Sequence, residues 1–160
     1  MSPLTSREPG VVGAALLDDN SYAGLILDGI HVHPETARLA HKLKAKIMLV
    51  TDAMPPVGSD QTQFDFFGGT VNRNGLTLTD SEGRLAGSAL DMNRAVNNAV
   101  EMLAIDKVDA IKLASANPAN FLGLSDDYGN LKIGAKASMI LLDERGNISD
   151  TWIDGKSINH

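Results

Sequence analysis

Two clusters of polar side chains lie where apolar segments of the chain end. The first, DGIHVH at residues 28–33, follows the apolar run 22–27, and the second is Asp52, which follows the run 46–50. Burying a carboxylate without a compensating partner costs several kcal/mol, so packing does not explain Asp52. An aspartate in this place either caps the next loop or acts as a general base or acid. Asp52 is therefore the first candidate catalytic residue.

His31 and His33 form a His-x-His pair, which places two imidazole rings on one side of an extended segment. A zinc site needs three or four ligands, and the other histidines are His41, expected on an exposed helix, and His160 at the end of the chain. We therefore expect His33 to face solvent beside a helix start and His31 to contact a substrate. The alternative hypothesis is a small, self-contained metal hydrolase that uses His31, His33 and Asp52 as ligands.

The segments that position these residues have the pattern of a parallel α/β sheet. The apolar runs 22–27 and 46–50 are typical of strands buried on both faces. Between them, Pro34 followed by an acidic residue favours a helix start, with apolar residues at helical spacing up to Leu43. Because ligands bind at the carboxyl ends of the strands in such sheets, both polar clusters are placed for chemistry.

The rest of the chain alternates between β-like and helical patterns. Phenylalanines and paired turn residues indicate hairpins over 64–87. Apolar residues recur at helical spacing over 92–103, and Ser88 with Asp91 is predicted to form the capping box of this helix. Two shorter helices are expected next, and β-hairpins are expected after Tyr128.

The composition excludes several classes of function. The chain has 160 residues, 14 basic against 20 acidic, a net charge of −6 and no cysteine. Disulfides, thiolate metal sites and cysteine nucleophiles are therefore excluded, and nucleic acid is not expected as a partner. No apolar run approaches the roughly 18 residues of a membrane span and no signal segment opens the chain, so the cytoplasm is favoured. One domain is expected, shorter than the ~200 residues of a complete eight-stranded α/β barrel.

Four motifs together resemble one enzyme family. They are SREPG at 6–10, DGIHV at 28–32, LVTDA at 49–53 and LAGSA at 85–89. In this order and spacing they are similar to the second half of the N-acetylglucosamine-6-phosphate deacetylases, a family of the amidohydrolase superfamily. Residues 129–137 also resemble the stretch by which amidohydrolases leave their barrel, although Ser138 stands where that family commonly has an aspartate.

The resemblance implies an α/β fold, namely the second half of a metal-dependent (β/α)₈ TIM-like barrel with strands of a small β-sandwich domain. Residues 1–125 are then expected to belong to the barrel, with a hairpin insertion at about 62–87, and residues 126–160 to the small β domain. The chain is expected to be a C-terminal fragment that is inactive alone. A non-catalytic fragment that associates with a partner is the alternative for the isolated chain.

The resemblance also implies roles for single residues. Asp52 matches the catalytic aspartate and His31 a histidine that contacts the sugar. Leu85, Ala86 and Gly87 match a backbone stretch that faces the substrate, and Arg7 matches an arginine that reaches the phosphate across a dimer interface. The divalent metal, which is zinc, iron, manganese or similar, is held in the family by a glutamate and two histidines that precede Met1.

The implied reaction is hydrolysis of N-acetylglucosamine 6-phosphate to glucosamine 6-phosphate and acetate. A bound divalent metal activates the attacking water and polarises the amide carbonyl. Asp52 is then expected to act as general base and afterwards as general acid for the leaving amine. An arginine offers two donors to a phosphate, which suits Arg7. The expected partners are this small phosphorylated amino sugar and a second copy of the chain, with no membrane or nucleic acid.

Overall fold

The computed structural model describes residues 2–158, so His160 lies outside the described residues. The helices in this range are α1 (Gly10–Leu17), α2 (Pro34–Leu43), α3 (Met92–Leu103), α4 (Lys107–Ala114) and α5 (Ala116–Phe121). The strands are β1 (Ala23–Leu25), β2 (Ile47–Leu49), β3 (Gln63–Phe66), β4 (Gly69–Asn74), β5 (Thr77–Thr79), β6 (Leu85–Ser88), β7 (Met139–Leu142), β8 (Ile148–Ile153) and β9 (Lys156–Ile158).

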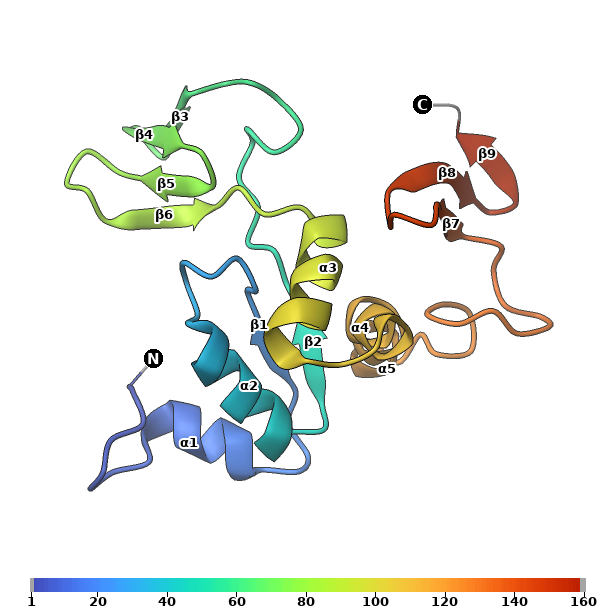
Figure 1. Ribbon diagram of the computed structural model, residues 1–160, viewed down its shortest axis with the longest axis horizontal. Helices are drawn as coiled ribbons and strands as arrows, with labels where there is room; N and C mark the ends of the chain where they lie inside the picture. The colour runs from blue at the N-terminus through green and yellow to red at the C-terminus, as the bar shows by residue number, and fades with distance from the viewer. Residues whose placement is uncertain (1, 159–160) are drawn as a thin grey trace.

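Strands β1 and β2 form a parallel pair joined by α2, which confirms the predicted strand, helix, strand order. The pairing is continued past the strands by the Val50 N–H, which donates to the Leu25 carbonyl at 3.0 Å. Leu27 and Ile47 are fully buried in a core that α1 to α4 also line. The predicted burial on both faces holds better for β2, where Ile47 and Leu49 are buried, than for β1, which is only half-buried with Gly24 exposed. Helices α2 and α3 lie beside the pair in Figure 1 and share its core.

Helix α3 buries one face formed by Ala95, Val96, Ala99 and Leu103, which confirms the predicted periodicity. The predicted capping box with Ser88 is wrong. The side chain of Asp91 alone caps the helix, since it accepts the Arg94 N–H at 2.8 Å. Ser88 is fully buried at the end of β6, with its backbone bonded to the segment after β2, and it is therefore not at the helix start.

Strands β3 to β6 form an antiparallel meander inserted between β2 and α3. The hairpins expected over 64–87 are present, and they have a small core of their own that includes Phe64, Val71 and Leu78. Figure 1 shows that the chain leaves β2 for this sheet and returns from β6 directly into α3. The insertion therefore starts and ends beside the carboxyl end of β2.

Strands β7 to β9 form a separate antiparallel sheet, on the other side of α3 from the meander in Figure 1. The irregular segment 122–138 connects this sheet to α5. The boundary predicted at 125 and 126 falls in this segment, and the assignment of the two parts to a barrel and a small β domain stays a prediction. In residues 2–158 we find no helix with the length and apolar character that crossing a membrane requires.

Candidate functional site

The carboxyl ends of β1 and β2 place the two predicted polar clusters side by side. Ala23 pairs with Ile47 and Leu25 pairs with Leu49, a constant offset of 24 residues. The same offset relates Asp28 to Asp52, so each aspartate follows its strand at an equivalent position. Asn98 of α3 fixes the end of β1, because its Nδ2 donates to the Leu27 carbonyl at 2.6 Å.

Asp28 is a buried carboxylate whose two oxygens both have partners. Oδ1 accepts the backbone N–H groups of Ile30 and His31, each at 2.9 Å. Oδ2 lies 2.6 Å from Nδ1 of His31. Burial is the largest single influence on the pKa of Asp28 and raises it, but the hydrogen bonds from His31 and Ile30 together outweigh burial and hold the pKa below its ordinary value. Asp28 is therefore ionised at neutral pH.

This lowered pKa predicts that Asp28 stabilises the fold except in acid. A carboxyl whose pKa is lower in the folded than in the unfolded chain contributes stability above its unfolded pKa, and this contribution is lost as the pH falls through the folded pKa. We therefore expect the free energy of unfolding to fall below about pH 4, and to fall less steeply in Asp28→Asn. Urea unfolding between pH 7 and pH 2, at fixed protein concentration, measures this.

The exposed aspartate Asp60, in the loop after β2, provides the control. We expect Asp60→Asn to keep the steep acid side of the wild-type profile. Identical profiles for Asp28→Asn and the wild type contradict the stabilising role of the Asp28 carboxylate.

His33 is exposed and caps α2, since its Nδ1 accepts the Glu35 N–H at 3.2 Å. It therefore lies beside a helix start, as the sequence indicates. His31 and His33 use their Nδ1 atoms for different local contacts, and His41 is half-buried rather than on an exposed face. The Nδ1 atom of His41 is buried without a hydrogen-bond partner in the described structure.

The described residues do not fit a divalent metal ion. Within residues 2–158, no group of three or more histidine, aspartate or glutamate side chains is arranged to hold one. His31, His33 and Asp52 do not form such a group, so the hypothesis of a self-contained metal hydrolase built on them is not supported.

Asp52 and the stretch Leu85–Gly87 lie together. Asp52 is exposed and has a φ of 50°, an uncommon value for a residue with a side chain. Its carbonyl accepts the Ser88 N–H at 2.9 Å, and the Ser88 carbonyl accepts the Met54 N–H at 2.9 Å. These two hydrogen bonds join the end of β6 to the segment after β2, so two of the sequence motifs form one edge of the candidate site.

Gly87 is required at this junction for two reasons. Its φ is +73°, and a Cβ at this position would lie 2.4 Å from Cγ of Met54 and 3.3 Å from the Asp52 carbonyl oxygen. We expect Gly87→Ala to lower the free energy of unfolding by about 2 to 4 kcal/mol, from backbone strain together with overpacking. Urea unfolding measures this loss.

Gly68→Ala is the matched control for this prediction. Gly68 has a similar φ of +78°, but a Cβ there would meet nothing within 4 Å. Its substitution therefore carries the backbone strain without the clash, and we expect it to cost at least ~1 kcal/mol less. Equal losses for the two variants contradict the close approach at Gly87.

Arg7 is exposed in the loop before α1. Thr5 closes this loop, since its Oγ1 accepts the Glu8 N–H at 3.1 Å. Figure 1 shows the loop at the outer side of α1, beyond α2 as seen from β1 and β2. Within one chain, the structure therefore joins Asp52 with Leu85–Gly87 and Asp28 with His31, and it leaves Arg7 apart from both.

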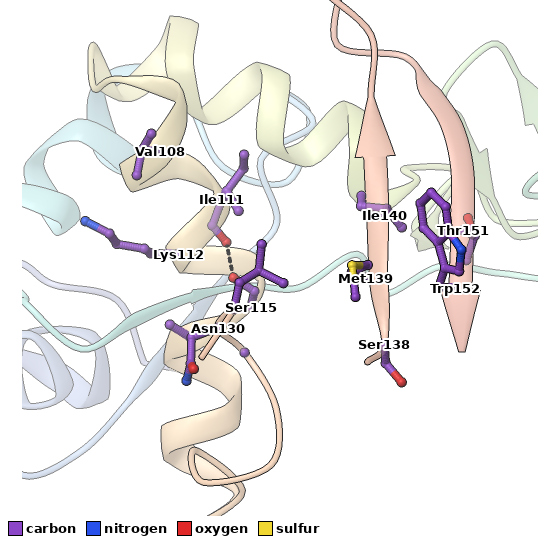
Figure 2. Close-up of a pocket in the computed structure, with 13 residues that line it drawn as sticks. Val108, Ile111, Lys112, Ser115, Asn130, Ser138, Met139, Ile140, Thr151 and Trp152 are labelled. Carbon is purple, nitrogen blue, oxygen red and sulfur yellow. Dashed lines mark hydrogen bonds between the residues drawn. The ribbon is translucent and has the colours of Figure 1, made fainter. Parts of the chain in front are cut away.

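An apolar groove of about 750 Å³ lies between α4 and the β7–β8 hairpin. Figure 2 shows Met139 and Trp152 of the hairpin across the groove from Ile111 of α4. None of the residues that the sequence predicts for the site lines this groove. The candidate site is therefore the polar edge at the carboxyl ends of β1 and β2, and the groove is a separate feature.

Two candidate residues at this edge, Asp28 and Asn98, are not singled out by the sequence pattern. Asp28 received no role of its own, although its spacing of three residues from His31 suits a local hydrogen bond. The sequence does not indicate a role for Asn98, because its hydrogen-bond partner, the Leu27 carbonyl, is 71 residues away in the chain. Only the packing of α3 on β1 shows that contact.

Comparison with known proteins extends over almost the whole chain. The model of the amidohydrolase family matches residues 4–158. The N-acetylgalactosamine-6-phosphate deacetylase of Shewanella sp. (strain ANA-3) is 48% identical over 98% of this chain and 40% of its own length. The putative N-acetylgalactosamine-6-phosphate deacetylase of Escherichia coli (strain K12) is 39% identical over 98% of this chain and 94% of its own length.

A solved structure gives the same result. The crystal structure of N-acetylglucosamine-6-phosphate deacetylase from Pasteurella multocida superposes with a TM-score of 0.95 at 33% identity, over 100% of this chain and 42% of that chain. The chain thus spans about two fifths of the length of the Shewanella and Pasteurella proteins. The resemblance predicted from the four motifs is confirmed, and because the family model covers nearly every residue, this chain belongs to the amidohydrolase family.

Proposed function

We propose that this chain supplies the proton-transfer and sugar-binding part of an N-acetylhexosamine 6-phosphate deacetylase. The observation that carries the proposal is the edge at the carboxyl ends of β1 and β2. The Asp28–His31 pair follows β1, Asp52 follows β2, and the backbone hydrogen bonds of Ser88 join the Leu85–Gly87 stretch to the segment of Asp52. The similarity of the whole chain to deacetylases supports the same function. We also propose that the chain forms the second half of a (β/α)₈ barrel, with β7 to β9 in a small β domain.

The proposed reaction breaks the amide bond of the N-acetyl group. A water oxygen attacks the carbonyl carbon, the bond from carbon to nitrogen breaks, and acetate and the free amine form. Asp52 accepts the proton of the attacking water and then delivers it to the leaving nitrogen. A divalent metal of the kind that the family uses would supply a water of lowered pKa and a polarised carbonyl. We propose that the ligands of this metal lie outside residues 2–158.

The other candidate residues bind and orient the sugar. We propose that His31 and the backbone of Leu85–Gly87 contact the sugar ring. Arg7 is proposed to bind the 6-phosphate of the substrate held by a second copy of the chain, since within one chain it lies apart from Asp52. This arrangement requires at least a dimer.

The sugar is proposed as a class that includes two epimers. The sequence motifs indicate N-acetylglucosamine 6-phosphate, whereas the Shewanella relative is named for N-acetylgalactosamine 6-phosphate. These sugars differ only in the configuration of the hydroxyl at C4. Both are therefore tested as substrates.

A fusion protein tests the proposal. It joins this chain to the part of the Shewanella relative that the chain does not cover. We expect the fusion protein to release acetate from at least one of the two sugar phosphates, and the isolated chain to release none from either. The Shewanella enzyme is the positive control. A folded fusion protein that releases no acetate from either sugar contradicts the proposed function.

A further inference from the structure

The pairing of Asp28 with His31 is built more firmly than a surface ion pair. The Asp28 side chain is completely buried, and that of His31 is only 18% exposed. One carboxylate oxygen accepts two backbone N–H groups of the loop, and the other lies 2.6 Å from Nδ1 of the ring. The loop is also fixed at its start, where Asn98 binds the Leu27 carbonyl.

This geometry determines which ring nitrogen carries the proton. An ionised carboxylate can only accept hydrogen bonds, so Nδ1 of His31 must donate. In the neutral ring the proton therefore sits on Nδ1, and Nε2 is left with a free lone pair. In this neutral form the ring presents an acceptor at Nε2, and the group that Nε2 recognises on a sugar is a hydroxyl donor.

We propose that Asp28 is a positioning residue, which holds the His31 ring with its proton on Nδ1 so that Nε2 accepts a hydrogen bond from a hydroxyl of the substrate. This inference rests on the proposed function for the identity of the substrate. The state of the ring does not depend on it, because it follows from the contacts of Asp28 alone.

Asp28→Asn is a sharp test because the loop fixes how the new amide is oriented. The N–H groups of Ile30 and His31 still need an acceptor, so the amide oxygen takes the place of Oδ1. The amide NH₂ group then faces Nδ1 of His31 and donates to it. We therefore expect the proton of the neutral ring to move from Nδ1 to Nε2 in this variant.

Solid-state ¹⁵N NMR of the chain labelled at histidine measures the two ring nitrogens, whether or not the chain self-associates. Spectra are recorded at about pH 9, where an ordinary histidine ring is neutral. The His31 signals are those that disappear in His31→Gln. We expect a protonated Nδ1 in the wild type and a protonated Nε2 in Asp28→Asn. A wild-type ring with its proton on Nε2 overturns the proposal, and this measurement needs no variant at Asp28.

Kinetics of the fusion protein test the consequence for the substrate. With the proton on Nε2, the ring loses its acceptor and meets the sugar hydroxyl with a second donor. We expect Asp28→Asn to lower kcat/KM by about 10- to 100-fold, mainly through a higher KM. An unchanged KM in a variant with the inverted ring overturns the role in binding. If the proposed function itself is wrong, the wild-type fusion protein is inactive, and the NMR result is unaffected. This outcome is therefore distinguishable from an unchanged KM and from a ring with its proton on Nε2.

Asp143→Asn is the matched control. Asp143 also closes a loop through both carboxylate oxygens, which accept the backbone and side-chain N–H groups of Asn147 at 2.8 and 3.0 Å. It lies between β7 and β8, outside the candidate site. We expect this variant to keep the wild-type kcat/KM within about twofold, so that a general effect of losing a loop carboxylate is distinguished from the effect on His31.

Discussion

In the fusion protein, Asp52→Asn is expected to lower kcat by about 10²- to 10⁴-fold and to leave KM nearly unchanged. Asparagine keeps the size of the side chain and its local hydrogen-bonding capacity, but it can neither accept the proton of the attacking water nor return it to the amine. The backbone at this position stays in place, because the hydrogen bonds from the Ser88 N–H to the Asp52 carbonyl and from the Met54 N–H to the Ser88 carbonyl use main-chain atoms only. Steady-state kinetics with the better of the two sugar phosphates measure the effect.

Asp60→Asn provides the control, since Asp60 is an exposed aspartate in the same loop between β2 and β3. We expect this control to have the wild-type kcat. A loss below ~10-fold for Asp52→Asn contradicts its role as general base and acid, because proton transfer by a positioned side chain contributes more than that.

Arg7→Ala is expected to raise KM for the phosphorylated sugar by about 10- to 100-fold, because a hydrogen bond to a charged group contributes ~1.5–3 kcal/mol. Arg7 is exposed in its loop and contributes little to packing, so the loss of its side chain is expected to leave the fold intact. The corresponding N-acetylhexosamine without phosphate is the matched substrate. Its KM is expected to stay the same, and equal losses on both sugars count against a contact with the phosphate.

Mixed dimers distinguish an arginine that acts across the interface from one that acts within its own chain. In a dimer of one Arg7→Ala chain and one Asp52→Asn chain, action across the interface leaves one of the two sites with both wild-type residues. We therefore expect the mixture to regain activity at low substrate concentration. No regain of activity in verified mixed dimers places Arg7 in the same site as the Asp52 of its own chain.

Local patterns in the sequence were sufficient for several elements. The apolar runs 22–27 and 46–50 predicted β1 and β2, and Pro34 predicted the start of α2, because the tendency to form a strand or a first helical turn depends on neighbouring residues. The glycine-containing turns likewise predicted the hairpins of β3 to β6. The order of four short motifs was also sufficient to predict the family, which the comparisons confirm.

Contacts between distant segments decided the rest. Ser88 has a local pattern that suits a helix cap, but its backbone pairs with the segment after β2, so Asp91 begins α3 instead. His41 lies on a helix whose pattern suggested exposure, and packing buries its Nδ1. Neither outcome can be read from neighbouring residues, because the competing hydrogen bonds and contacts come from elsewhere in the chain.

The candidate site shows the same division. The sequence by itself determined which side chains follow β1 and β2, and the parallel pairing of these strands then places Asp28 and Asp52 at the same end of the pair. Only the tertiary structure decided that Asp28 is buried against the ring of His31, and that Leu85–Gly87 lies against Asp52. The physical reason is that the positions of the strands along the chain follow local apolar patterns. Burial and hydrogen-bond partners depend instead on where the meander and α3 pack after the chain has folded back.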